Sequence, residues 1–174
     1  MYYHRARLSP RDFVGCGDDA IVNKPYTSHI YPYNQYHLGI EGSFNKKGYD
    51  HTFNFYASVN GHYFGVSSYP LQWAPHDWYI VVGVYDGSYL KLYVYGSLAS
   101  NREYDPSIGR PIIDNEKWTL VGSKAFTGTL DSFDTNLFIG KQGNKNYSIP
   151  AEVDWVRIYS RALSNAEVTK LRGQ

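Results

Sequence analysis

Residues 78–96 constrain the fold more than any other part of the chain. Two runs rich in β-branched and aromatic residues, 78–85 and 89–95, flank the dipeptide Asp86-Gly87. Asp-Gly favours a type I′ turn, which joins two strands of a hairpin because its twist matches theirs. In the second run apolar residues alternate with tyrosine and lysine, which is typical of a strand with one buried face. That face would carry Leu90, Leu92 and Val94.

Further strands are predicted from alternation and composition along the rest of the chain. They cover residues 20–24, 35–41, 52–58, 62–67, 118–122, 136–140 and 152–159. Asn60-Gly61 is a second hairpin signal. Ser164 and Glu167 have the spacing of a capping box, which predicts one short helix over 165–171. Many short strands and one terminal helix indicate an antiparallel β-sandwich.

Two motifs in the C-terminal half narrow this prediction. Trp78 to Gly96 follows the pattern W-x-x-V-x-G-x-Y-D-G-S-x-L-x-L-Y-V-[ND]-G except at Tyr95, which stands where the pattern has Asn or Asp. Asp154 to Glu167 follows D-x-V-R-I-Y-x-R-A-L-S-x-x-E. Together they resemble the laminin-G-like branch of the concanavalin A-like lectin and glucanase superfamily. The resemblance covers about half the chain. Ile139-Gly140 best fills the family's I-G position, and Val121-Gly122 is a second, earlier candidate for it. It implies an all-β fold, an antiparallel two-sheet jelly-roll sandwich with one short C-terminal helix, in a single domain spanning 1–174.

The N-terminal segment matches the family poorly. Residues 1–20 contain arginines and turn-forming residues, and are predicted to be irregular. The opening strand of the family has no counterpart there. An open sheet edge is a hazard that proteins usually cover. Either that strand has diverged, or something else, such as a strand from a partner chain, fills its place in the sheet.

Charge and composition exclude several classes of partner. The formal net charge is +1, so neither nucleic acid nor an anionic membrane is expected to attract the chain. No apolar run is long enough to insert into a membrane, and residues 1–10 lack the apolar run that a signal peptide needs, so none is expected in this sequence. The location of the protein stays unknown at this stage, and an extracellular or virion location is favoured. Cys16 is the only cysteine and is interpreted as a buried hydrophobe.

The superfamily that the chain resembles includes retaining glucanases, so catalysis is one possible function. Those enzymes use paired carboxylates on one strand, one as nucleophile and one as acid/base. The resemblance implies a triplet of acids, for which Glu152 and Asp154 fill two positions and Val156 replaces the third. The chain is therefore expected not to be an enzyme. The six histidines show no metal-ligand spacing, and His37 is interpreted as a partly exposed strand residue.

No cofactor is expected, with calcium as the alternative that the resemblance leaves open. Calcium needs six to eight oxygen ligands, several of them carboxylates on loops. Asp18 and Asp19 are neighbours in the sequence, and Asp131 and Asp134 are close to each other in a predicted loop. Surface acids in turns are the preferred interpretation of both pairs.

Aromatic residues in loops are the candidate ligand-binding groups, because a sugar packs its apolar face on an aromatic ring while polar groups fix its hydroxyls. Three clusters combine such residues. They are Trp73 with His76 and Asp77, Tyr104 with Asn101 and Arg102, and Tyr31 with Tyr33. Trp78 and Trp155 occupy motif positions and are predicted to lie in the core.

Three functional hypotheses remain open at this point. The first is a non-catalytic recognition module that binds glycan or a glycosylated surface. The second is a structural subunit of a virus particle or surface layer, which would contact other protein subunits. The third, a retaining glycanase, is disfavoured by Val156.

Overall fold

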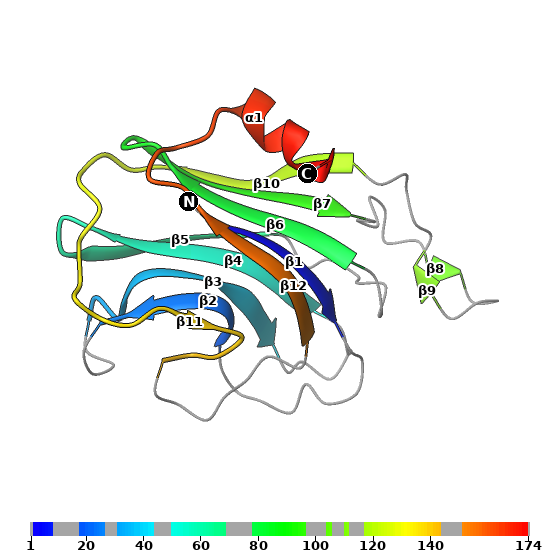
Figure 1. Cartoon of the computed structure of the whole chain (residues 1–174), viewed down its shortest axis with the longest axis horizontal. Helices are drawn as coiled ribbons and strands as arrows, with labels where there is room; N and C mark the ends of the chain where they lie inside the picture. Colours follow the sequence, from blue (N-terminus) through cyan, green and yellow to red (C-terminus); the bar gives the residue numbers. More distant parts are fainter. Residues whose placement is uncertain are drawn as a thin grey trace.

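The computed structural model describes residues 2–8, 18–26, 31–43, 50–68, 78–96, 104–105, 110–111, 117–143 and 151–173. Ten strands form two antiparallel sheets that stack on each other, and a short helix follows at the C-terminus (Figure 1). This confirms the predicted antiparallel two-sheet jelly-roll sandwich with one short C-terminal helix.

Sheet I has the strand order β10-β7-β6-β1-β12. Its strands are β10 (Lys117–Ala125), β7 (Tyr89–Gly96), β6 (Trp78–Tyr85), β1 (Tyr2–Leu8) and β12 (Ala151–Ile158). Sheet II has the order β11-β2-β3-β4-β5. Its strands are β11 (Phe138–Ile139), β2 (Asp18–Pro25), β3 (Asn34–Ser43), β4 (Asp50–Val59) and β5 (His62–Ser67). A separate pair joins β8 (Tyr104–Asp105) to β9 (Arg110–Pro111).

Strand β1 corrects the prediction that the N-terminal segment is irregular. It pairs antiparallel with β6 on one side and β12 on the other, so that Tyr2 faces both Gly83 and Ile158. The chain itself therefore fills this place in sheet I, and the idea that a partner supplies the strand is wrong. The segment carries two arginines and a histidine, and local propensity missed it because pairing on both sides decides its conformation.

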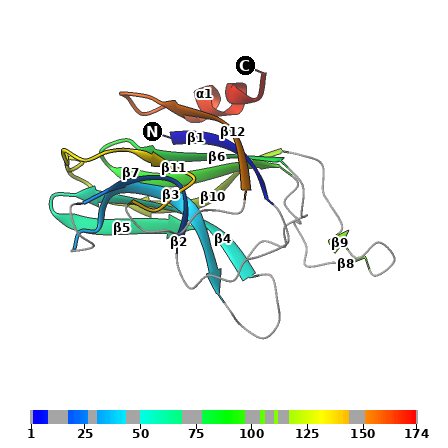
Figure 2. The same cartoon turned by 60° about the horizontal axis from the view of Figure 1, so that its bottom comes forward.

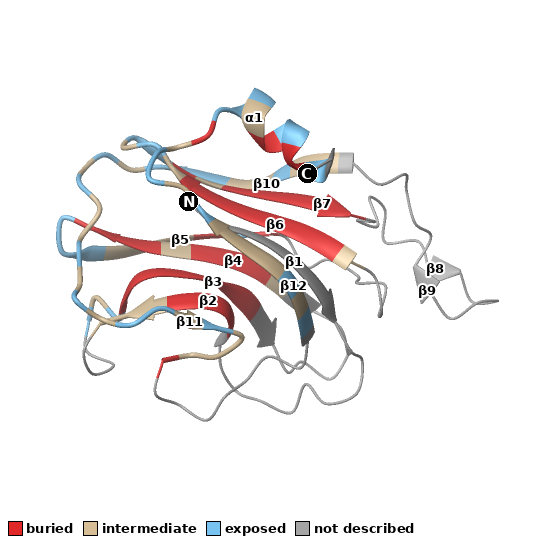
Figure 3. Cartoon of the chain, viewed as in Figure 1, coloured by how far each residue is buried: buried red, intermediate tan, exposed pale blue. Residues whose placement is uncertain are grey.

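The main core lies between the two sheets, where side chains of β3 and β4 meet those of β6 and β7. These four strands include long buried stretches (Figure 3). Its fully buried members include Leu38, Ile40, Phe53, Phe55, Val81, Leu90 and Leu92. Gly83 of β6 faces this core. A Cβ atom at Gly83 would lie 2.5 Å from the Phe55 ring, so glycine lets that ring lie directly against the opposite sheet.

Helix α1 (Asn165–Thr169) lies over sheet I, on the side away from sheet II (Figure 2). A second apolar cluster lies between this outer face of sheet I and the helices α1 and η1 (Lys170–Gly173). Strand residues and helix residues bury each other there: Ile80, Val82, Val84, Tyr93, Tyr95, Leu163, Val168 and Leu171. Strand β7 therefore has two buried faces, whereas its alternation predicted one. Trp155 is half-buried against this cluster, and Trp78 is half-buried at the start of β6.

The predicted helix start is confirmed. The Ser164 hydroxyl accepts the Glu167 N–H at 3.3 Å, and the Glu167 carboxylate accepts the Ser164 N–H at 2.8 Å. These reciprocal bonds satisfy two backbone donors that the first turn of a helix leaves without intrahelical partners. They fix the point at which the chain leaves β12 and crosses sheet I.

The two predicted hairpins form, but with different turns. Asn60 and Gly61 both have positive φ, at +50° and +76°, as a type I′ turn requires. In the other hairpin Tyr85 pairs with Leu90, and Gly87 has a φ of +90° whereas Ser88 does not have a positive φ. A positive φ at the first central residue alone defines type II′, so the type I′ prediction is wrong here.

Asp86 explains this difference. It precedes the two central residues, and its Oδ1 atom accepts the N–H groups of Ser88 at 3.0 Å and Tyr89 at 2.7 Å. Its Oδ2 atom lies 2.8 Å from Lys91 Nζ. Asp86 thus stabilises the turn from the position before it, and the two central residues of the turn are Gly87 and Ser88 instead of Asp86 and Gly87.

Residues 126–131, which we call the strap, pass from sheet I to the hairpin end of sheet II (Figure 1). On the sheet II side, Asn60 and Thr129 exchange two hydrogen bonds: Asn60 N–H to the Thr129 carbonyl at 3.1 Å, and Thr129 N–H to Asn60 Oδ1 at 3.0 Å. The Gly61 N–H donates to Asp131 Oδ2 at 2.9 Å. The strap therefore binds the tip of the β4–β5 hairpin.

On the sheet I side, the same strap binds the tip of the β6–β7 hairpin. The Gly128 N–H donates to the Gly87 carbonyl at 3.2 Å, and the Phe126 N–H donates to the Ser88 carbonyl at 2.7 Å. The Tyr85 hydroxyl donates to the Gly128 carbonyl at 2.7 Å. Hydrogen bonds thus join the turns of both sheets through one segment.

Candidate functional site

Three tyrosines form a patch at the hairpin end of sheet II. We call Tyr31, Tyr33 and Tyr63 the tyrosine platform. Tyr31 is 50% exposed and Tyr33 40% exposed. The Tyr31 and Tyr33 ring centroids lie 5.7 Å apart at an interplanar angle of 82°, and those of Tyr33 and Tyr63 lie 5.7 Å apart at 79°. Edge-to-face contacts of this kind stabilise aromatic pairs beyond the area they bury.

An unusual backbone turn presents Tyr33. Its φ is +58°, which is uncommon for a residue with a side chain. The Asn34 N–H donates to the Pro32 carbonyl at 2.7 Å and closes a three-residue turn around Tyr33. A γ-turn with positive φ is rare and strained. Strain of this kind persists only where surrounding contacts enforce it, and it concentrates at ligand sites.

Ser58 of β4 enforces this turn from below. Its side chain is fully buried, and its hydroxyl donates to the carbonyl of Asn34 and lies 3.2 Å from that of Pro32. The Tyr26 N–H also donates to the Tyr33 carbonyl at 2.7 Å. Contacts from two neighbouring segments therefore hold the strained residue in place.

Side-chain hydrogen bonds fix the rings themselves. The Tyr31 hydroxyl accepts the Tyr63 N–H at 2.9 Å and lies 3.5 Å from His62 Nδ1. Asn34 Nδ2 donates to the Tyr63 hydroxyl at 2.8 Å. Because the rings are held before a ligand arrives, binding would cost little additional side-chain entropy.

Aromatic contacts continue from the platform across the outer face of sheet II. Tyr63 and Tyr56 are stacked, with centroids 5.1 Å apart and an angle of 10°. Tyr56 makes an edge contact with His37 at 6.0 Å. A Cβ atom at Gly65 would lie 2.2 Å from the Tyr56 ring, so this glycine makes room for the ring above β5.

His37 departs from its prediction. It was expected to be partly exposed, but it is 1% exposed, and this burial lowers the pKa of its imidazole from 6.5 to about 4. Asn23 Nδ2 lies 3.3 Å from His37 Nδ1 and 2.6 Å from Asn34 Oδ1. A buried, neutral His37 that accepts at Nδ1 carries its proton on Nε2. A hydrogen-bonded chain thus links His37 through Asn23 and Asn34 to Tyr63.

Two atoms of this series of hydrogen-bonded side chains have no hydrogen-bond partner in the part of the protein that the structure describes. They are Asn23 Oδ1 and His37 Nε2. Burying polar groups without partners costs free energy. The outer face of sheet II therefore holds polar groups whose presence stability alone does not explain.

The candidate acids on β12 do not converge with the platform. Glu152 and Asp154 are both exposed. A bulge at Asp154, where Arg5 faces Trp155 and Ala6 faces Val153, turns both Val153 and Val156 toward the inter-sheet core. The position that would need a third acid therefore faces the apolar interior.

The structure also bears on the acids considered for calcium. Asp131 bonds the Gly61 backbone, as described for the strap, and Asp134 is exposed. Asp18 and Asp19 begin β2, but their side chains lie outside the described residues. Among the residues that are described, no group of three or more histidines, cysteines or acids could hold a metal ion.

Several sequence candidates lie outside the described residues. They are Cys16, Trp73, His76, Asp77, Asn101 and Arg102. Tyr104 lies in β8, but its side chain is likewise not described. Of the three aromatic clusters, only Tyr31 with Tyr33 can be placed, and the structure adds Tyr63, Asn34 and Ser58 to it.

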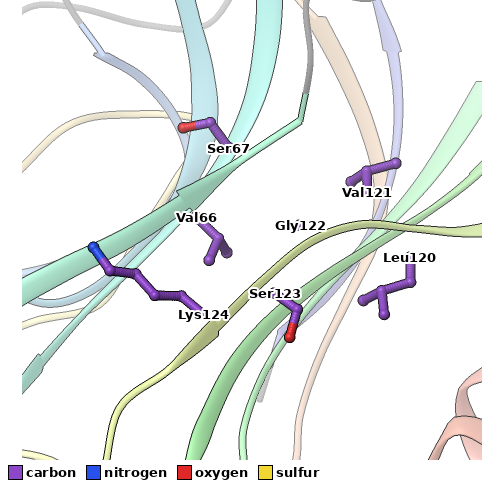
Figure 4. Close-up of a pocket in the computed structure, with 7 residues that line it drawn as sticks. All are labelled: Val66, Ser67, Leu120, Val121, Gly122, Ser123 and Lys124. Atoms are coloured by element: carbon purple, nitrogen blue, oxygen red, sulfur yellow. The ribbon is translucent and has the colours of Figure 1, made fainter.

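A shallow groove lies elsewhere, between edge strands β5 and β10 (Figure 4). Val66, Leu120 and Val121 contribute apolar surface, with Ser67, Ser123 and Lys124 as its polar groups. A Cβ atom at Gly122 would lie 3.1 Å from the Ser67 carbonyl oxygen, so the two strands approach closely here. With no acid among its lining residues, the groove does not offer the carboxylate pair of a glycosidase.

Comparison of the sequence with protein-family models and with curated proteins finds no match. In the described residues, no helix is both long enough and apolar enough to cross a membrane.

Proposed function

We propose that this chain is a non-catalytic recognition module that binds glycan, or a glycosylated surface, through the tyrosine platform. One observation supports this most: two half-exposed tyrosines are held rigidly by a strained turn and by hydrogen bonds. An exposed aromatic ring leaves apolar surface in contact with water and adds little to a core. A rigid aromatic surface is therefore better explained by a ligand than by stability.

The chemistry of the platform suits a sugar. The apolar face of a pyranose ring packs on an aromatic ring, and nearby polar groups can bond its hydroxyls. His62 is exposed and lies beside Tyr31, and Asn60 is exposed at the hairpin tip. The resemblance of residues 78–168 to laminin-G-like domains agrees with this function, although a fold supports many functions.

The remaining parts of the proposal follow from the same features. Binding through aromatic rings needs neither catalytic acids nor a metal ion, so the module would act without a cofactor. A protein that recognises glycan would work where glycans are displayed, outside a cell or on a virus particle.

A glycan array followed by calorimetry on its strongest ligand tests the proposal. Tyr31→Ala and Tyr33→Ala should each weaken binding by at least about 1 kcal/mol, or about fivefold in Kd, as for an aromatic anchor. Tyr89→Ala is the matched control, because Tyr89 is 46% exposed and packs beside Lys91 on β7 rather than in the platform. It should bind like the unmodified protein.

Two results would contradict this assignment. Loss of binding in Trp73→Ala, with normal binding in both platform variants, would move the site to the loop that contains Trp73. Absence of binding to every glycan, together with a large assembly in size-exclusion chromatography, would favour the structural-subunit alternative.

A further inference from the structure

The two exposed rings of the platform are perpendicular. Tyr31 and Tyr33 meet at 82° with their centroids 5.7 Å apart. Because the two ring planes are perpendicular, a flat ligand can stack on the face of only one of the two rings. The rings therefore form a corner rather than a flat surface.

The other rings do not extend the corner into a flat surface. Tyr33 and Tyr63 are also close to perpendicular, at 79°. Tyr56 and Tyr63 are nearly parallel, at 10°, but they stack on each other at 5.1 Å, so no sugar can lie between them. Among the described rings of this patch, no two exposed faces lie side by side in one plane.

This geometry limits what a glycan can do at the platform. A linear polysaccharide bound along its length stacks successive units on rings that face the same way. Perpendicular rings separated by 5.7 Å leave no room for a second unit beside the first. One unit can instead place its apolar face on one tyrosine and its edge against the other.

Polar groups beside the corner suit a single sugar. The exposed His62 has Nδ1 3.5 Å from the Tyr31 hydroxyl, at one side of the corner. An imidazole can both donate and accept, which matches the hydroxyl groups on the rim of a pyranose. To bond His62, the edge of the sugar that faces it would need free hydroxyl groups. The terminal unit of a glycan has such an edge, because only one of its sides carries a glycosidic bond.

We infer that the platform recognises one terminal pyranose unit of a glycan, not the interior of a polysaccharide chain. This inference rests on the proposed function and names the part of the glycan that the same site takes.

A chain-length series tests it. The probes are methyl β-glycosides of glucose and N-acetylglucosamine, together with their β-1,4-linked di-, tri- and hexasaccharides, and methyl glycosides of galactose and mannose. Binding is followed by NMR shifts of the tyrosine rings. For any sugar that binds, Kd should change by less than about threefold from the monosaccharide to the hexasaccharide. Blocking the non-reducing end should weaken binding more than tenfold.

The alternative outcomes separate the two claims. A Kd that improves tenfold or more with chain length, and that depends on both Tyr31 and Tyr33, would overturn the terminal-unit inference but keep the glycan-binding function. Failure of every probe and of every glycan on the array to bind, in protein shown to be folded by its NMR spectrum, would overturn both. Tyr89→Ala, which removes an exposed ring outside the platform, provides the control for changes in folding.

Discussion

The two sheets share one core, but their outer faces differ. The outer face of sheet I is apolar, and the chain covers it with its own C-terminal helices through Val168 and Leu171. The outer face of sheet II instead carries buried polar groups, among them Asn23, His37 and Ser58. The first face contributes to stability in the ordinary way, by removing apolar surface from water. The second has the platform at its end, so the comparison separates a face that stabilises the fold from a face that carries the proposed binding site.

The largest expected effect tests the covered face of sheet I. Val168→Asp would place a charge at the fully buried position of α1 that packs on sheet I, and should lower the free energy of unfolding by more than about 3 kcal/mol. Ala166→Asp is the control, because Ala166 is exposed on the same helix and should change stability by less than about 0.5 kcal/mol. Urea unfolding measures both. Similar values for the two variants would show that the helix does not stabilise this face.

The next effect concerns pH and the buried face of sheet II. Burial lowers the pKa of His37 from 6.5 to about 4, so the unfolded chain binds a proton more readily than the folded one. The stability that neutral His37 provides is complete above pH 6.5 and is lost as pH falls toward 4. The loss should approach about 3 kcal/mol.

Urea unfolding between pH 7 and pH 4.5 measures this dependence. His37→Gln cannot titrate, so the variant should lose less stability than the unmodified protein over the same range. Parallel curves for the two proteins would mean that His37 is not buried and neutral, and that the outer face of sheet II is more hydrated than the structure shows.

The smallest effect concerns Ser58, which holds the strained turn. Ser58→Ala removes the hydroxyl that donates to the Asn34 carbonyl and contacts the Pro32 carbonyl, and it should cost about 1–2 kcal/mol of stability. It should also weaken glycan binding, because Tyr33 would be less rigidly placed. Ser67→Ala is the control, since Ser67 is exposed at the far end of β5. A Ser58 variant that is less stable but binds normally would show that the turn supports folding and not recognition.

Local patterns predicted the strands and the helix start well. Ser164 with Glu167, and Asn60 with Gly61, carry their structural information within a few residues, and both predictions are confirmed. Strand β1 and the type II′ turn were not predicted. The first depends on pairing with two distant strands, and the second on the bonds that Asp86 makes from outside the turn.

The candidate site was predictable only in part. Tyr31 and Tyr33 stand out in the sequence because they flank a proline. Tyr63 and Asn34 could not be joined to them, because a hydrogen bond between residues 29 positions apart forms only once β3, β4 and β5 are paired. His37 was misjudged for a related reason: alternation correctly placed it opposite Leu38, but that face was assumed to be solvated.

The strap has a mechanical consequence for the platform. Two sheets that touch only through apolar side chains can shift past each other, because such contacts are not directional. Here Asn60 and Gly87, on different sheets, are tied through residues 126–131 by hydrogen bonds that a shift would break. A force applied to a bound glycan at the end of sheet II would therefore pass into sheet I as tension along the strap, and both sheets would share the load.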